Sequence, residues 1–220
     1  MLVVGAKSMA KELLGLLIDN HDANNLNIAF FDNINKDIPP KLYDKFDVIT
    51  NYQEAQEYLK INPKFTLGIG NPELRRKMFE KFKSLGGQFT SVISKQSIIS
   101  DFGTTIGEGA LIMPGVVITN DVKIGKGVLI NINTSISHDA EIGDFSEIAC
   151  GVVIPGRCKL GEEVFIGSNA TINPDIPISH MKCHFPKLPG CPHCFRGRRE
   201  IHPIIRSEND PSIMQRSDEI

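Results

Sequence analysis

From Ile106 to Ile178 the sequence repeats with a period of six, because every sixth residue is Ile or Leu without interruption. Two residues before most of these positions stands a small or β-branched residue, as at Val116, Ala140 and Cys158. Side chains two residues apart on a strand point to the same side, so both sets are expected to line one interior. A repeat of one short strand and one corner is typical of a β-helix, in which each coil packs on its neighbours.

Glycine often follows the aliphatic position of the hexad, and we expect it to permit a tight corner there. These glycines are Gly107, Gly125, Gly143, Gly161 and Gly167.

The first half of the chain alternates short apolar segments with amphipathic ones. Strands are predicted over residues 2–4, 27–32, 46–50, 64–70 and 88–93. Helices are predicted over residues 8–20, 52–60 and 72–86. Such alternation indicates a parallel sheet that binds ligands outside the carboxyl ends of its strands. Those ends hold Gly5–Ser8, Asp32–Asn33 and Gly70–Asn71.

The loop "GAKSMAK" is not the GxGxxG pattern of a dinucleotide site. It is expected either to present a helix N-terminus to a phosphate or to hold Gly5 as a simple turn glycine. Both alternatives stay open on these residues alone.

The composition describes a globular chain of 220 residues with 41% hydrophobic residues and a formal net charge of -2. That balance gives no indication of a nucleic-acid partner, and no apolar run is long enough for membrane insertion. The N-terminus lacks the basic region of a signal peptide, so a cytoplasmic location is expected.

The hexads resemble the left-handed parallel β-helix of hexapeptide-repeat acyltransferases. With the α/β half, the chain resembles the sialic-acid O-acetyltransferase-like, nucleotide-aminosugar N-acetyltransferases. The segments that carry this resemblance include "LVVGAKSMAKELLGLL", "GIGNPELRRKM" and "ININTSISHDAEIGDFSEIACGVVIPG". The left hand is implied by the family, because the general rule for parallel crossovers would predict a right hand.

The resemblance implies a fold and a domain order. We expect a Rossmann-like nucleotide-sugar-binding domain over 1–88, a left-handed β-helix over 89–179, and an irregular tail over 180–220. It also implies a homotrimer that binds acetyl-CoA between subunits and acetylates a nucleotide-linked 3- or 4-amino sugar, with no metal required.

The resemblance makes His138 the general base and Asp139 its acidic support. Two residues after an inward Ile, His138 should lie at a coil corner and point outward, stacked between Asn120 and Gly156 of the adjacent coils. Gly156 would leave room for a thioester. The alternative is a solvated corner histidine without a catalytic role.

Further site residues are assigned by the strand ends and by the resemblance. The substrate residues are Gly5, Lys7, Ser8, Asp32, Asn33, Gly70 and Asn133. The coenzyme A residues are Glu147, Gly156, Gly167 and Ser168.

Three departures from the family stand out. Lys7, Ser8 and Met9 replace a glycine-rich loop, and a second family histidine falls on Glu147. The third departure is the tail, which contains "CPHC" at 191–194 and ends the hexads early. It is interpreted as zinc-binding, as disordered or as foreign sequence, the last two being favoured.

Two other functions compete with the N-acetyltransferase. One is a sugar O-acetyltransferase of the same fold. The other is a non-catalytic, trimeric nucleotide-sugar-binding scaffold, suggested by the missing coils and by Glu147.

Overall fold

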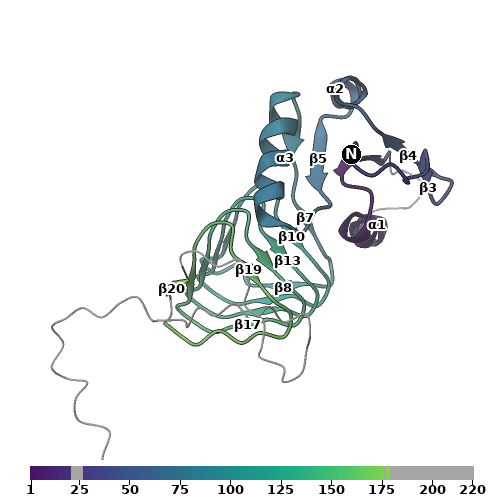
Figure 1. Cartoon of the computed structure of the whole chain (residues 1–220). Helices are drawn as coiled ribbons and strands as arrows, with labels where there is room; N and C mark the ends of the chain where they lie inside the picture. The colour runs from purple at the N-terminus through teal and green to yellow at the C-terminus, as the bar shows by residue number, and fades with distance from the viewer. Residues whose placement is uncertain (21–26, 176, 179–220) are drawn as a thin grey trace, which may run out of the picture. The chain divides into compact units, whose positions relative to one another are not determined.

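The structure is a computed structural model that describes residues 1–20, 27–175 and 177–178. All of these residues belong to one compact unit, Met1–Pro186. The chain builds a mixed sheet with three helices and then a stack of short strands (Figure 1). Among the described residues, no helix is long and apolar enough to span a bilayer.

The first sheet has the strand order β3-β4-β2-β1-β5-β6, and only β3 is antiparallel to its neighbour. On one side of the central β1 lie β2, β4 and β3, in that order toward the edge. The chain then crosses to the other side of β1, where β5 and β6 lie. The order therefore reverses between β1 and β5, where parallel sheets form a ligand crevice. The strands are β1 (Leu2–Val4), β2 (Ala29–Phe31), β3 (Lys41–Leu42), β4 (Phe46–Ile49), β5 (Lys64–Leu67) and β6 (Gln88–Phe89).

Helices cover both faces of this sheet. α1 (Ser8–Asn20) packs on the face that includes Val3 and Phe30. α2 (Tyr52–Ile61) and α3 (Pro72–Ser84) pack on the opposite face. Asn51 and Asn71 cap the second and third helices, each accepting a hydrogen bond of 2.9 Å from a backbone N–H of the first turn.

The remaining strands pair in three parallel sheets, in the pattern of a left-handed β-helix. Paired residues are 18 apart in sequence, except in the first coil, where β7 and β8 pair with residues 19 further on. The first sheet of the coils contains β7 (Val92–Ile93), β10 (Leu111–Ile112), β13 (Leu129–Ile130), β16 (Glu147–Ile148) and β19 (Phe165–Ile166). The second contains β8 (Ile98–Ile99), β11 (Val117–Ile118), β14 (Ser135–Ile136) and β17 (Val153–Ile154). The third contains β9 (Thr105–Ile106), β12 (Lys123–Ile124), β15 (Glu141–Ile142), β18 (Lys159–Leu160) and β20 (Pro177–Ile178).

The hexad positions form the interior of the coils as expected. The aliphatic column and the small column pack in one buried cluster, and Cys158 is wholly buried in the small column. The regular period begins only at Ile106 because Ile106 lies seven positions after Ile99, one more than the repeat of six.

The expected corner geometry was wrong in one respect. The residues in the left-handed region lie three positions after the aliphatic residue, as at Gly109, Asp121 and Asp139. The glycines directly after the aliphatic residue are required by the spacing between coils and not by the turn. A Cβ on Gly143 would lie 2.4 Å from the backbone carbonyl carbon of Gly161 in the next coil. These glycines allow coils to stack closely, while the turn itself is made by the later residue.

The strand predicted over 88–93 is also corrected. Gln88–Phe89 pairs with β5 in the first sheet, whereas Val92–Ile93 pairs with β10 in the coils. The chain thus leaves one sheet and enters the other between Phe89 and Val92.

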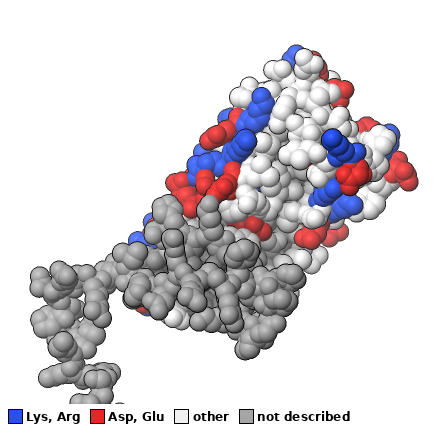
Figure 2. Space-filling view, viewed as in Figure 1, with Lys and Arg blue, Asp and Glu red and all other residues white. Residues whose placement is uncertain are grey.

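The α/β part packs on the outer face of the first coil sheet. Outward Leu111 and Leu129 share a buried cluster with α1, and Phe79 of α3 lies 5.3 Å from the ring of Phe145. On the molecular face shown in Figure 2, basic and acidic side chains lie interspersed.

Candidate active site

His138 and Asp139 lie together at the corner between β14 and β15. His138 Nδ1 is 2.7 Å from Asp139 Oδ2, and both side chains are exposed. Asp139 has a φ of 60°, a conformation in which Asp is among the more tolerant residues. If Nδ1–H donates to the carboxylate, the lone pair of the imidazole is on Nε2.

Gly156 lies one coil along, directly against this imidazole. A Cβ on Gly156 would come within 2.6 Å of His138 Cε1 and 2.7 Å of Nε2. The Arg157 N–H donates to the His138 carbonyl oxygen at 2.9 Å, and the Asp139 N–H donates to the Asn120 carbonyl oxygen at 3.3 Å. The expected stacking of Asn120, His138 and Gly156 is therefore present in the coils.

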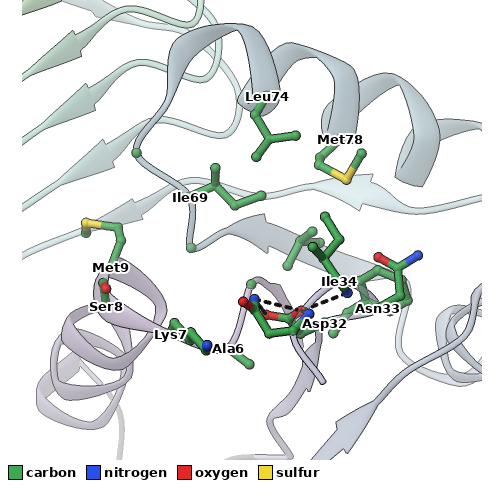
Figure 3. A pocket seen from close by; sticks show the side chains of 16 residues that line it. Ala6, Lys7, Ser8, Met9, Asp32, Asn33, Ile34, Ile69, Leu74 and Met78 are labelled. Carbon is green, nitrogen blue, oxygen red and sulfur yellow. Dashed lines mark hydrogen bonds between the residues drawn. The ribbon is translucent and has the colours of Figure 1, made fainter. Parts of the chain in front are cut away.

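A pocket of about 210 Å³ opens at the carboxyl ends of β1, β2 and β5 (Figure 3). This is the point where the strand order reverses. Six of the seven predicted substrate residues line it, together with Leu74 and Met78 of α3. These six are Gly5, Lys7, Ser8, Asp32, Asn33 and Gly70.

Two glycines bring the strand ends and α1 close together at this pocket. Gly5 has a φ of 109°, and a Cβ there would lie 2.6 Å from the Gly68 carbonyl oxygen. A Cβ on Gly68 would lie 2.6 Å from the Ala10 Cβ of α1. Gly68 was not among the predicted site residues, although a glycine at the end of the apolar run "FTLG" is a signal for close approach.

Polar side chains of the pocket have partners within the chain. Asp32 Oδ1 accepts hydrogen bonds from the N–H groups of Ile34 and Asn35, at 3.1 Å and 3.0 Å, drawn in Figure 3. The Asn35 side chain also donates to this carboxylate. Lys7 Nζ lies 3.3 Å from Asp37 Oδ2 in an exposed pair. Asp32 thus stabilises its own loop, whatever else it binds.

A second pocket of about 440 Å³ adjoins the first at Gly70, which lines both. Its other lining residues are Asn71, Pro72, Glu73, Glu147, Glu163 and Phe165. The Glu147 carboxylate faces Gly70, since a Cβ on Gly70 would lie 3.0 Å from Glu147 Oε1. Burial raises the pKa of Glu147, and the positive charge of Arg75 opposes that shift.

Arg75 is wholly buried beneath this junction. Its guanidinium donates to the carbonyl oxygens of Leu67 and Ile69, at 3.2 Å and 2.6 Å, and twice to that of Gly127, at 3.0 Å and 2.7 Å. Burial lowers its pKa to about 10, and the Glu147 charge opposes that shift. The sequence signal was a basic residue at helical spacing from buried Pro72, Met78 and Phe82.

The remaining predicted residues lie at other corners of the coils. Asn133 follows β13 and Ser168 follows β19, so both lie between the first and second coil sheets. Gly167 lies beside Ser168 and is buried. His138 lies between the second and third sheets, so these residues and Glu147 are not brought to His138 within one chain.

Among the described residues, no group of three His, Cys, Asp or Glu side chains is placed to hold a metal ion. The "CPHC" segment falls outside the described residues.

Residues 103–138, 121–156 and 139–174 match the family model of the bacterial transferase hexapeptide, six repeats. A relative named GDP-perosamine N-acetyltransferase, from Escherichia coli O157:H7, is 28% identical over 151 residues. That match covers 67% of this chain and 66% of the relative, slightly less than two thirds of its length.

Solved structures share the fold at low sequence identity. A mutant of perosamine N-acetyltransferase from Caulobacter crescentus, in complex with CoA and GDP-perosamine, has a TM-score of 0.66 at 19% identity, over 83% of this chain and 92% of that one. The acetyltransferase domain of PglB from Neisseria gonorrhoeae, with acetyl coenzyme A, has a TM-score of 0.64 at 22% identity, over 80% and 91%. WeeI from Acinetobacter baumannii has a TM-score of 0.63 at 23% identity, over 80% and 92%.

Proposed function

We propose that this chain, whose residues 103–174 match the bacterial transferase hexapeptide model, is an acetyl-CoA-dependent N-acetyltransferase acting on a nucleotide-linked 3- or 4-amino sugar. The observation that carries the proposal is the His138–Asp139 pair at 2.7 Å, with the imidazole exposed beside Gly156. The Escherichia coli relative and the perosamine N-acetyltransferase fold support the substrate class.

The chemistry follows from the free ring nitrogen. The neutral amine of the sugar attacks the thioester carbonyl, and His138 Nε2 takes the amine proton as the C–N bond forms. Asp139 holds the ring and stabilises the imidazolium. The C–S bond then breaks, and the proton passes from the imidazolium to the thiolate of coenzyme A. No acyl-enzyme is required, since placing both substrates together supplies much of the rate.

Coenzyme A would bind along the coils beside Gly156. Because that glycine has no side chain, the thioester can approach the imidazole and a backbone N–H can stabilise the developing oxyanion. Gly167, Ser168 and Glu147 were assigned to the same ligand, and Asn133 to the sugar, but they lie away from His138 in one chain. In a homotrimer a neighbouring subunit would supply Gly167, Ser168 and Asn133, whereas Glu147 lines the second pocket of its own chain.

The α/β part would act as a Rossmann-like domain over 1–88 that binds the nucleotide. Gly5, Lys7 and Ser8 lie where the α1 N-terminus meets the first pocket, which suits a diphosphate. Asp32 and Asn33 line the same pocket at the end of β2, within reach of a ribose or base.

The homotrimer is supported by an apolar row on the second coil sheet. Its outward residues stand side by side on neighbouring strands, in the order Ile98, Val117, Ser135 and Val153. Ile98 and Val153 are substantially exposed. This row borders the corner that carries His138. A second copy of the chain would cover it and complete the groove beside the histidine.

The test is formation of acetylated product from acetyl-CoA and a panel of GDP-, UDP- and dTDP-linked 3- and 4-amino sugars. Product is identified by mass, because Cys150 is an exposed free thiol that disturbs a thiol assay. We expect product with one sugar, and its loss in His138→Ala. Folded trimer that acetylates none of the amines would contradict the proposal, and acetylation of a hydroxyl would favour the O-acetyltransferase.

A further inference from the structure

Arg75 joins the wall of the proposed nucleotide-sugar pocket to the β-helix. Its Nη1 binds the carbonyl oxygens of Leu67 and Ile69, at the end of β5. Its Nε and Nη2 bind the carbonyl oxygen of Gly127, at a corner of the coils. One rigid, planar guanidinium thus fixes the position of one backbone segment relative to another.

That wall belongs to both pockets. Gly68, Ile69 and Gly70 line the first pocket, and Gly70 also lines the second. Glu147 projects from β16 against Gly70 from the coil side, so closely that a Cβ there would lie 3.0 Å from its carboxylate. Backbone carbonyl oxygens accept the hydrogen bonds of the buried guanidinium, and the charge of Glu147 opposes the effect of burial on its pKa.

We infer that Arg75 is a positioning residue that holds the Gly68–Gly70 wall against the β-helix, and that Glu147 acts at this wall on the sugar side and not on coenzyme A. The inference rests on the proposed function for its substrate names, but the clamp itself is a property of the structure. It changes the expected role of Glu147, which the family resemblance had placed with coenzyme A.

The clamp is tested without any substrate. Hydrogen–deuterium exchange of the segment around Gly68–Asn71 is measured in the full chain, in Arg75→Met and in the control Lys77→Met. Lys77 is an exposed charge on the same helix. We expect exchange at the wall to rise about tenfold or more in Arg75→Met only, because three carbonyl groups, two of them buried, lose their donor. Unchanged exchange in folded Arg75→Met would overturn the clamp.

If Arg75→Met does not fold, Arg75→Lys serves instead. Lysine keeps the charge but lacks the planar fork, so we expect a smaller increase confined to the same segment. Exchange equal to that of the wild type would again overturn the inference.

The role of Glu147 is tested by steady-state kinetics of Glu147→Gln. We expect the KM for the nucleotide sugar to rise about tenfold, while the KM for acetyl-CoA stays within about twofold. The opposite pattern would return Glu147 to coenzyme A. If the wild type makes no product, the proposed function fails, and the exchange experiment still decides the clamp.

Discussion

The imidazole of His138 lies against the backbone of Gly156 in the next coil, in space that any other residue would fill. A Cβ at position 156 would come within 2.6 Å of the ring. This relationship joins the proposed base to an open stretch of backbone where a thioester can approach.

Gly156→Ala should therefore lower kcat roughly 100-fold, because the ring must turn away from Asp139 to make room for the methyl group. The matched control is Gly15→Ala, where a Cβ meets no atom within 4 Å. That change in α1 should keep full activity and add about 0.5–1 kcal/mol to the free energy of unfolding. Equal activity of both variants would contradict the steric argument.

Asp139→Asn should lower kcat by about 10²–10⁴-fold with little change in either KM. The amide can keep a hydrogen bond to His138 Nδ1 but cannot stabilise the imidazolium. Steady-state kinetics and a thermal melt of the same sample measure the effect. A variant as active as the wild type would show that the 2.7 Å contact is not used in catalysis.

Gly68→Ala should destabilise the protein by about 1–3 kcal/mol, because its Cβ would overlap the Ala10 Cβ of α1. Moving α1 away from β5 also disturbs the first pocket, so affinity for the free nucleotide should fall. Urea unfolding and calorimetric titration with GDP, UDP and dTDP measure the two effects. An unchanged denaturation midpoint would contradict this expectation, because it would mean that α1 moves without lowering the free energy of unfolding.

Glu147→Gln should make stability less dependent on pH. Burial raises the pKa of Glu147 in the folded state above its usual value of 4.5. At a pH between these two pKa values, the native protein therefore binds more protons than the unfolded chain. Wild-type stability should accordingly fall as the pH rises through the raised pKa, and this loss should vanish in the variant. Glu73 and Glu163 line the same pocket and remain in both proteins. Melting temperatures from pH 4 to 7 test the difference, and parallel curves would refute it.

Val153→Glu should convert the proposed trimer to monomers, because it places a charge in the exposed apolar row of the second coil sheet. Lys159→Glu, on the exposed third sheet, is the control and should leave the assembly unchanged. Light scattering after size exclusion gives the mass of each. A Val153→Glu trimer would place the interface elsewhere.

The inward residues of the coils were predictable because aliphatic residues recur at every sixth position from Ile106 to Ile178. The first pocket was predictable because parallel strands end at one edge, so Gly5, Asp32 and Gly70 had to meet there. The surroundings of Glu147 were not, because they depend on how a helix and a loop pack on the outer face of the coils. No local period in the sequence encodes that packing. The one sequence signal for it was Arg75, a basic residue on the apolar side of a helix.

The 18-residue register also limits how the gene can change. Gain or loss of one codon between His138 and Gly156 would bring Pro155 or Arg157 onto the imidazole in place of glycine. An extra residue between Ile99 and Ile106 causes no such mismatch, since it precedes the coils that carry the histidine. We therefore expect natural variants to differ in length by whole coils, or near the first coil, and to keep the interval of 18 residues unbroken.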